Sequence, residues 1–163
     1  MKSFASLLAV VLFAVAPSQG MAQSDVAAVL ASPARPQADR DQDAQRHAAD
    51  VIKFFGIKSG DHVVDMLTGG GYWTRIFVPL VGPSGKVYAG NNPFFGRFYT
   101  KAEDALFAEP AFKNVVRIDG PVDKIALPTD GSLDAVIMVM AYHDLFLTDE
   151  NRGEMNKKIF AAL

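Results

Sequence analysis

Tyr142, His143 and Asp144 are three consecutive residues whose side chains can take part in acid–base chemistry. A histidine that pairs with a carboxylate titrates near neutral pH, and it can act as a general base that deprotonates an acceptor hydroxyl or amine. Consecutive residues do not face each other in a regular strand or helix, so a pair between His143 and Asp144 requires a turn. These three residues are therefore the candidate catalytic group. A histidine that is hydrogen-bonded only to hold its loop is the alternative.

A glycine cluster supplies the second candidate site. A short apolar run ends in Asp65, glycines occupy positions 69–71, and Tyr72 opens a segment with a helical pattern. Glycines at a strand-to-helix turn let backbone N–H groups approach a ligand, and the start of the helix favours polar or anionic groups. The pattern is typical of a site for a nucleotide-type ligand. Leu67 stands where such loops usually carry their first glycine.

Purely structural roles are the alternatives for several of these residues. The glycines at 69–71 could form only a tight turn, and Asp65 could simply cap the following helix or hydrogen-bond its loop. Tyr72 and Trp73 are interpreted as aromatic residues of the core or of a pocket wall. Four more aromatic residues follow the next predicted strand, and for two of them packing under a loop is favoured over a place in a pocket wall. They are Phe94, Phe95, Phe98 and Tyr99.

The elements that would position these residues alternate along the chain. Helices are indicated by apolar residues at spacings of three and four, and strands by short apolar runs. Pro79 is expected to kink or end its helix, and Thr148 is the predicted N-cap of the last helix. The predicted helices are 38–55, 71–81, 99–108 and 149–163, and the predicted strands are 62–66, 86–90, 114–118 and 135–140.

This alternation predicts an α/β fold with a mainly parallel sheet and helices on both faces. In such sheets the ligand lies beyond the carboxyl ends of the strands. The segments that fall at this edge are 65–72, 91–95, 119–123 and 141–144. Both candidate sites belong to this set, so we expect the function of the chain at the carboxyl edge of the sheet.

The first residues have the pattern of an export signal. Lys2 is the only charge within 1–22, an apolar run covers 4–16, Pro17 ends it, and small residues precede a cleavage position after Ala22. The apolar run is shorter than the roughly 20 residues that span a bilayer. Residues 1–22 are therefore predicted to be a cleaved signal peptide, and the protein to be periplasmic or secreted without a stable membrane anchor. A retained amphipathic anchor is the alternative.

Composition narrows the classes of partner. The chain has 163 residues, a formal net charge of −2 and no cysteine, which excludes disulfides and a lipidated cysteine. Its length suits one domain with a sizeable core. Lysines and arginines are scattered rather than clustered, so no nucleic-acid partner is expected. His47, His62 and His143 lie on separate predicted elements without the spacing of metal ligands, so no metal site is expected.

Several segments, taken in order, resemble class I S-adenosylmethionine-dependent methyltransferases. They are Phe54–Gly60, Val64–Asp65, Gly69–Thr74 and Gly85–Ala89. More narrowly, the chain is similar to a group of exported, predicted methyltransferases. The similarity lies in Ser32-Pro33, Arg35-Pro36 and the segment 142–144. The chain then divides into a signal peptide at 1–22, an N-terminal helical lead-in at 23–56 and a partial methyltransferase-like α/β domain at 57–163 with a Rossmann-like sheet.

The resemblance implies a small-molecule ligand, S-adenosylmethionine, as cofactor. Asp65 matches the family's acid at the end of the first strand, near the amino-acid end of the cofactor. Gly69 and Gly71 match two glycines of the loop that packs under the methionine portion, and Gly70 and Tyr72 belong to the same cofactor-binding stretch. The resemblance therefore assigns these five residues to the cofactor.

Two further positions match the family's cofactor anchors. Asn91 stands where the second strand usually ends in an acid that accepts hydrogen bonds from both ribose hydroxyls. Asp119 is one of the acids nearest to the place where an aspartate often meets the adenine amine. The implied activity is methyl transfer from S-adenosylmethionine to an unknown acceptor. The alternative is a non-catalytic exported binding or scaffold protein that retains the fold, which export, Leu67 and Asn91 favour.

The family's sheet has seven strands and four are found here, so the domain is expected to be truncated after the fourth strand. By resemblance the strand order is third, second, first, fourth, which leaves the fourth strand at an open edge. Its run, 135–140, carries neither charge nor proline, although exposed edges normally have such protection. We therefore expect poor solubility or self-association through this edge.

Overall fold

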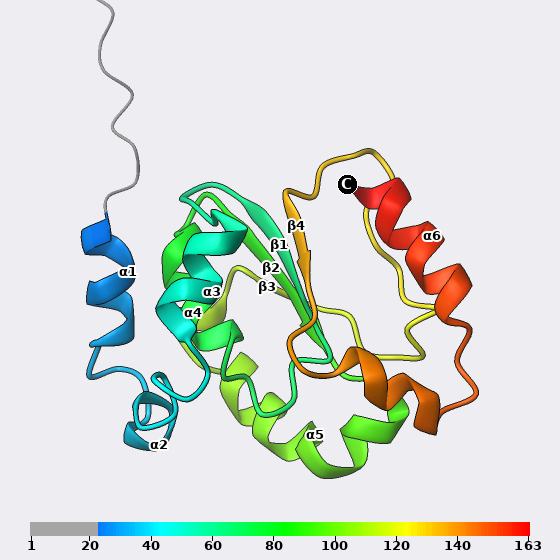
Figure 1. Cartoon of the computed structure of the whole chain (residues 1–163), viewed down its shortest axis with the longest axis horizontal. Helices are drawn as coiled ribbons and strands as arrows, with labels where there is room; N and C mark the ends of the chain where they lie inside the picture. Colours follow the sequence, from blue (N-terminus) through cyan, green and yellow to red (C-terminus); the bar gives the residue numbers. More distant parts are fainter. Residues whose placement is uncertain (1–22) are drawn as a thin grey trace, which may run out of the picture.

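The computed structural model describes residues 23–163, so the predicted signal peptide lies outside the described part of the chain. Short helices precede the first strand, and helices and strands then alternate (Figure 1). In chain order the elements are α1 (Gln23–Leu30), α2 (Gln37–Arg40), α3 (Ala48–Phe55), β1 (His62–Met66), α4 (Thr74–Val81), β2 (Lys86–Gly90), α5 (Pro93–Phe107), the 3-10 helix η1 (Pro110–Phe112), β3 (Val115–Arg117), β4 (Ala135–Ile137), the 3-10 helix η2 (Tyr142–Leu147) and α6 (Arg152–Ala162).

Four parallel strands form one sheet in the order β3-β2-β1-β4. β1 pairs with β2 along its whole length, from His62 opposite Lys86 to Met66 opposite Gly90. β3 lies outside β2, and β4 lies outside β1 (Figure 1). The predicted α/β fold and the predicted strand order are therefore confirmed. β1 and β2 also have the predicted bounds, because each is a short apolar run between turn residues.

Helices cover both faces of the sheet, as predicted. Side chains along β1 alternate between the faces, so Val63 packs with α1, α3 and α4 while Val64 packs with α6. In Figure 1, α3 and α4 lie on one side of the sheet and α6 lies on the other. Phe77 of α4 and Met155 of α6 are large, fully buried side chains of the two cores. Burial on both faces explains why β1 is almost continuously apolar.

The predicted helix over 38–55 is wrong as one continuous helix. The structure has α2 and α3 with a series of turns between them. His47, directly before α3, has a φ of 49°, in the left-handed region that interrupts a helix. The break directs the stretch 41–47 toward the glycine loop. The contacts made there, described below, explain why this polar stretch leaves the helical path.

Local caps set the starts of two other helices. α5 begins at Pro93, earlier than predicted, because the Oδ1 of Asn92 accepts a hydrogen bond at 3.0 Å from the N–H three residues later. α6 begins at Arg152 and is capped by Asn151, so the prediction of Thr148 as the cap is wrong. Within residues 23–163, no helix combines the length and the apolar character needed to cross a membrane.

Two more elements differ from their predicted bounds. α4 begins at Thr74 rather than at residue 71, and it continues past Pro79 to Val81. β4 ends at Ile137, because only three of its residues pair with β1 and the described chain places no strand on its outer side. The carboxyl ends of β1 and β4 nevertheless lie side by side, which brings the glycine loop close to the segment that follows β4.

Candidate functional site

A cavity of about 470 Å³ lies at the carboxyl edge of the sheet. Its wall combines the lead-in, the loop after β1, part of α5 and the segment after β4. A volume in this range suits a small organic ligand or cofactor. We call it the edge cavity. The lining residues include Gln42, Arg46, Leu67, Gly69, Gly70 and Asp144.

Two non-glycine residues of the edge cavity have a positive φ dihedral angle. Leu67 has a φ of 61° and Met140 has a φ of 56°. Holding a residue with a Cβ atom in the left-handed region costs about 1–2 kcal/mol, and such residues cluster at functional sites. Leu67 directly follows β1, and Met140 comes shortly after β4, so both turns shape the same wall. A glycine at position 67, as the resemblance leads one to expect, would adopt this conformation without strain.

Asp65 lies beneath the loop, 2% exposed, and does not line the edge cavity. Its Oδ2 accepts hydrogen bonds from the Oγ1 atoms of Thr68 at 2.8 Å and Thr74 at 2.6 Å, and these two hydroxyl oxygens are 2.6 Å apart. Burial raises the pKa of Asp65, against the effect of the threonine bonds. Through these two bonds Asp65 ties the loop to α4.

Asn91 and Asp119 support the glycine loop across the ends of three strands. The side chain of Asn91 pairs twice with Gly69: its Oδ1 accepts from the Gly69 N–H at 2.9 Å, and its Nδ2 donates to the Gly69 carbonyl at 3.1 Å. The backbone N–H of Asn91 donates to Asp119 Oδ1 at 3.0 Å. Neither residue lines the edge cavity. The resemblance matches Asn91 to a ribose contact and Asp119 to an adenine contact. In this structure both residues instead hold the glycine loop in place.

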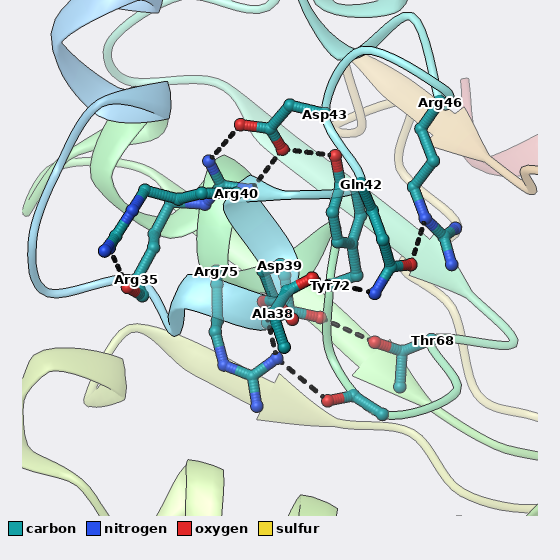
Figure 2. Close-up of polar contacts among 12 residues, drawn as sticks. Arg35, Ala38, Asp39, Arg40, Gln42, Asp43, Arg46, Thr68, Tyr72 and Arg75 are labelled. Atoms are coloured by element: carbon teal, nitrogen blue, oxygen red, sulfur yellow. Dashed lines mark hydrogen bonds and ion pairs between the residues drawn. The ribbon is translucent and has the colours of Figure 1, made fainter.

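A partly buried ion pair joins the lead-in to the glycine loop (Figure 2). Arg35, 3% exposed, donates to both carboxylate oxygens of Asp43 at 2.8 and 2.7 Å, and the Tyr72 hydroxyl donates to Asp43 Oδ1 at 2.6 Å. Burial acts to raise the pKa of Asp43, but the bonds from Arg35 and Tyr72 outweigh it and hold this pKa below its ordinary value. Burial and the Asp43 carboxylate raise the pKa of Tyr72, which therefore remains a neutral donor.

A second ion pair reaches the backbone of the loop. Arg75 Nη1 donates to Asp39 Oδ2 at 3.1 Å and to the Gly70 carbonyl at 3.0 Å (Figure 2). Arg40 donates to the Ser32 carbonyl at 3.1 Å and so folds the lead-in onto itself. The two ion pairs hold the lead-in against one side of the glycine loop.

Arg46 is the basic residue of the edge cavity, and it was not predicted as a site residue. Its guanidinium lies over the Tyr72 ring, 4.4 Å from the ring centroid, and its Nε donates to Gln42 Oε1 at 2.9 Å. Within residues 23–163, its terminal nitrogens have no hydrogen-bond partner, so an anion in the cavity can bind them. The one signal in the sequence is a lead-in rich in arginine and glutamine shortly before the glycine loop.

α5 places two of the four predicted aromatic residues in the wall of the edge cavity. The rings of Phe95 and Tyr99 are stacked, with centroids 6.4 Å apart and an interplanar angle of 22°. Gly69 and Gly70 face this wall, since a Cβ at either position would lie within 3.9 Å of the Tyr99 ring. Phe98 is 69% exposed instead. The two glycines therefore let the loop lie close to the Tyr99 ring, at a separation where an added side chain would touch the ring.

The candidate catalytic group lies on η2. The turn brings His143 Nε2 to 3.3 Å from Asp144 Oδ1, and the His143 side chain is 72% exposed. Asp144 lines the edge cavity, while the Tyr142 hydroxyl accepts a hydrogen bond from Asn156 of α6 at 3.2 Å. The pair of His143 and Asp144 thus exists at the rim of the cavity, and Tyr142 faces α6. No three His, Asp or Glu side chains in the described range 23–163 gather as metal ligands.

The chain was compared with known proteins. No protein-family model matches it. It is similar to the ubiquinone/menaquinone biosynthesis C-methyltransferase UbiE of Pseudomonas paraeruginosa, with 29% identity over 100 residues. This match covers 61% of the chain and 38% of UbiE, so the chain spans about two fifths of the length of that relative.

Two solved structures share the architecture. A SAM dependent methyltransferase from Aquifex aeolicus has a TM-score of 0.58 at 24% identity, over 86% of this chain and 66% of that one. CrArsM, an arsenic(III) S-adenosylmethionine methyltransferase from Chlamydomonas reinhardtii, has a TM-score of 0.51 at 19% identity, over 85% and 45%. At these identities the likeness shows the fold. The chain therefore has the fold of these S-adenosylmethionine-dependent methyltransferases, and over 100 residues its sequence is similar to that of UbiE.

Proposed function

We propose that this chain binds S-adenosylmethionine in the edge cavity and transfers its methyl group to a small acceptor molecule. The observation that carries the proposal is the position of the cavity, between the glycine loop and the aromatic wall of Phe95 and Tyr99, at the carboxyl ends of β1 and β4. Ligands of doubly wound α/β sheets bind at this edge. The similarity to a protein named as a C-methyltransferase supports the class of reaction.

The residues of the edge cavity fit this cofactor. The terminal nitrogens of Arg46 suit a carboxylate, and the carboxylate of Asp144 suits an amino group. The Phe95 and Tyr99 rings suit an adenine. Asp65 is buried and bonded to two threonines, so its proposed role in cofactor binding is to hold the loop rather than to contact the ligand.

His143 is the proposed general base. When bound, the cofactor supplies an electrophilic methyl group on its sulfonium. An acceptor hydroxyl or amine that takes this methyl group must lose a proton, and the imidazole of His143 at the cavity rim can accept it. Asp144, 3.3 Å away, orients the imidazole and stabilises its charged form. The lead-in and the glycine loop form the wall of the edge cavity on the side where the cofactor is proposed to bind.

Calorimetric titration of the full chain with S-adenosylmethionine tests the binding step. We expect one site, and we expect Arg46→Ala to weaken binding about tenfold because the carboxylate loses its partner. Arg97→Ala is the matched control, since Arg97 also lies over an aromatic ring, 4.8 Å from the centroid of Phe94, but outside the edge cavity. A wild-type chain that does not bind the cofactor would refute the proposal.

A non-catalytic exported binding or scaffold protein is the second candidate function. The loop-supporting contacts of Asn91 and Asp119 and the exposure of His143 favour it. Turnover separates the two candidates: for an enzyme, His143→Ala should abolish methyl transfer and leave cofactor affinity unchanged. Cofactor binding without transfer to a panel of hydroxyl and amine acceptors would support the binding protein instead.

We also propose that the chain is exported and that it self-associates through the outer edge of β4. The charge and apolar pattern of residues 1–22 supports export. Mass spectrometry of the periplasmic fraction should find a mature protein that begins at Gln23. A product that keeps Met1 and stays with the cytoplasmic fraction would contradict export.

A further inference from the structure

A second cavity, of about 540 Å³, lies between α1, α4 and η1. We call it the lead-in cavity. It shares no lining residue with the edge cavity. Much of its wall is apolar and includes Val29 of α1, Val78 of α4 and Phe112 of η1. Its volume falls in the range of small-molecule sites.

Basic side chains converge on this apolar wall. Arg35, Arg75 and Lys113 line the lead-in cavity, against a single acid, the exposed Glu109. Arg35 and Arg75 are already paired with Asp43 and Asp39, but the Nε and Nη2 of Arg75 have no hydrogen-bond partner within residues 23–163, and these donors together with Lys113 favour an anionic ligand. The apolar wall in turn favours a ligand with a hydrocarbon part. The two requirements are met together by an amphipathic anion.

Arg35 provides an unused donor at this wall. Its Nη atoms are bonded to Asp43 and to the Leu30 carbonyl, but its Nε is buried and has no hydrogen-bond partner within the described part of the chain. Leaving such a group unpaired costs about 1–3 kcal/mol. Because this Nε is buried, a ligand oxygen reaches it only after a shift of the surrounding wall.

Both arginines are held in place before any ligand arrives. Asp43 fixes the guanidinium of Arg35 with two bonds, and Asp39 and the Gly70 carbonyl fix that of Arg75. A ligand therefore does not have to order these long side chains, which lowers the entropic cost of binding.

We propose that the lead-in cavity binds a small amphipathic anion, a carboxylate with an unbranched apolar chain of several carbons. The carboxylate meets Arg35 and Arg75, with Lys113 nearby, and the hydrocarbon chain packs on Val78 and Phe112. This site goes beyond the function proposed above and does not depend on it.

Calorimetric titration of the full chain with octanoate tests the proposal. We expect one saturable site, and we expect octanol, which has the same chain without the charge, to bind at least about tenfold more weakly. Ala28→Trp should abolish octanoate binding, because exposed Ala28 lines the cavity and an indole there fills it. Ala27→Trp, at the exposed neighbouring residue outside the wall, should bind octanoate like the wild type.

A charge variant gives an independent measurement. Arg35→Gln would also break the ion pair with Asp43 and could unfold the lead-in, so the charge is better tested at exposed Lys113. Lys113→Gln should weaken octanoate binding severalfold and leave thermal stability unchanged. Equal affinities for octanol and octanoate, full binding by Ala28→Trp, or no saturable binding to the wild type would each overturn the proposal.

Discussion

At the scale of single residues, two buried carboxyl groups have opposite pKa shifts. Burial raises the pKa of Asp65, whose side-chain donors are two hydroxyls, whereas the bonds from Arg35 and Tyr72 lower the pKa of Asp43 against the effect of burial. The stability that Asp65 contributes is complete below its ordinary value of 3.8 and is lost as pH rises through the raised pKa. The stability that Asp43 contributes is present above 3.8 and is lost as pH falls through the lowered pKa.

Asp65→Asn should remove the first of these two pH dependences. The amide is neutral at every pH, and its NH2 group, placed where Oδ2 lies, can donate to both threonine hydroxyl oxygens. We expect the free energy of unfolding at neutral pH to be equal to or higher than that of the wild type, with a flatter dependence between about pH 4 and pH 7. Thermal melts across this range measure both. If the wild type and the variant lose stability equally as pH rises, Asp65 is not the titrating group.

Leu67→Gly should open the loop at a modest cost in stability. Glycine removes strain of about 1–2 kcal/mol at a φ of 61°, but the loss of a buried leucine side chain costs about 1.5–3 kcal/mol. We expect a net loss of about 1 kcal/mol in the free energy of unfolding together with tighter S-adenosylmethionine binding. Leu67→Ala is the control, because it loses the side chain and keeps the strain. Equal stability of the two variants would show that the backbone at residue 67 is not strained.

At the scale of elements, the lead-in is fastened to the glycine loop by polar bonds. The bond between Tyr72 and Asp43 and the bond between Arg75 and Asp39 join stretches that are far apart in the sequence. The wall that the lead-in gives to the edge cavity therefore depends on charged side chains. Acid should release the stretch 31–47 before it unfolds the sheet, since the sheet is held together with α1 and α3 by apolar packing.

Asp43→Asn should release the lead-in at neutral pH. The substitution leaves the Arg35 guanidinium buried without its carboxylate, and breaking such a pair costs about 3 kcal/mol. We expect faster hydrogen exchange and faster proteolysis within residues 31–47, with the amides of β1 still protected. Asp50→Asn is the control, since the side chain of Asp50 is 85% exposed on α3. An unchanged exchange rate in the lead-in would contradict this account.

The sheet could be predicted from the sequence, whereas the route of the lead-in could not. β1 and β2 are short apolar runs with turn residues at their ends, and the alternation of elements then gives the parallel order. The stretch 41–47 has an acceptable helical pattern, and only its contacts with Tyr72 and Arg35 explain the break in the helix. In the candidate site, the glycine loop and the segment 142–144 were located because both follow strands. Arg46 could not be predicted either, because it lies in the stretch 41–47, whose path depends on tertiary contacts.

The sequence also placed Asn91 correctly at the edge of the sheet without predicting its contacts. An asparagine at a strand end has no local signal for a partner, and its amide here pairs with the backbone of Gly69 through tertiary contacts. The capping error at Thr148 has a similar cause, because the side chain of Asn151 competes for the same role three residues later. Local patterns predict which elements form, and tertiary bonds decide which polar side chains remain free.

At the scale of the whole molecule, the two edges of the sheet differ. β3 carries Arg117, whose guanidinium forms ion pairs with Glu103, Asp104 and Asp119. Charged edges of this kind resist pairing with another chain. A largely apolar groove lies between α3 and the segment that follows β4, lined by Asp50, Val51, Phe54, Phe55, Met138, Val139 and Met140. Self-association is therefore expected at β4 and not at β3.

Phe54→Asp should suppress self-association. Phe54 is 82% exposed beside the β4 edge, so a carboxylate there places like charges in contact when two copies meet. Sedimentation velocity over a concentration series should show larger species for the wild type and a monomer for the variant. Phe98→Asp, at a 69% exposed position on α5, is the matched control and should associate like the wild type. A wild-type chain that stays monomeric at every concentration would rule out the interface.

Trp73 gives the protein an intrinsic fluorescence reporter. It is the only tryptophan of the chain, it lines the edge cavity, and it packs edge-on against Tyr72 and parallel to Phe77. The emission wavelength of an indole depends on the polarity around its ring, so all tryptophan emission of the wild type reports on one wall of one cavity. A ligand in the edge cavity should shift this emission without any label. Octanoate in the lead-in cavity does not touch the indole, so a shift in this emission reports that the edge cavity in particular is filled.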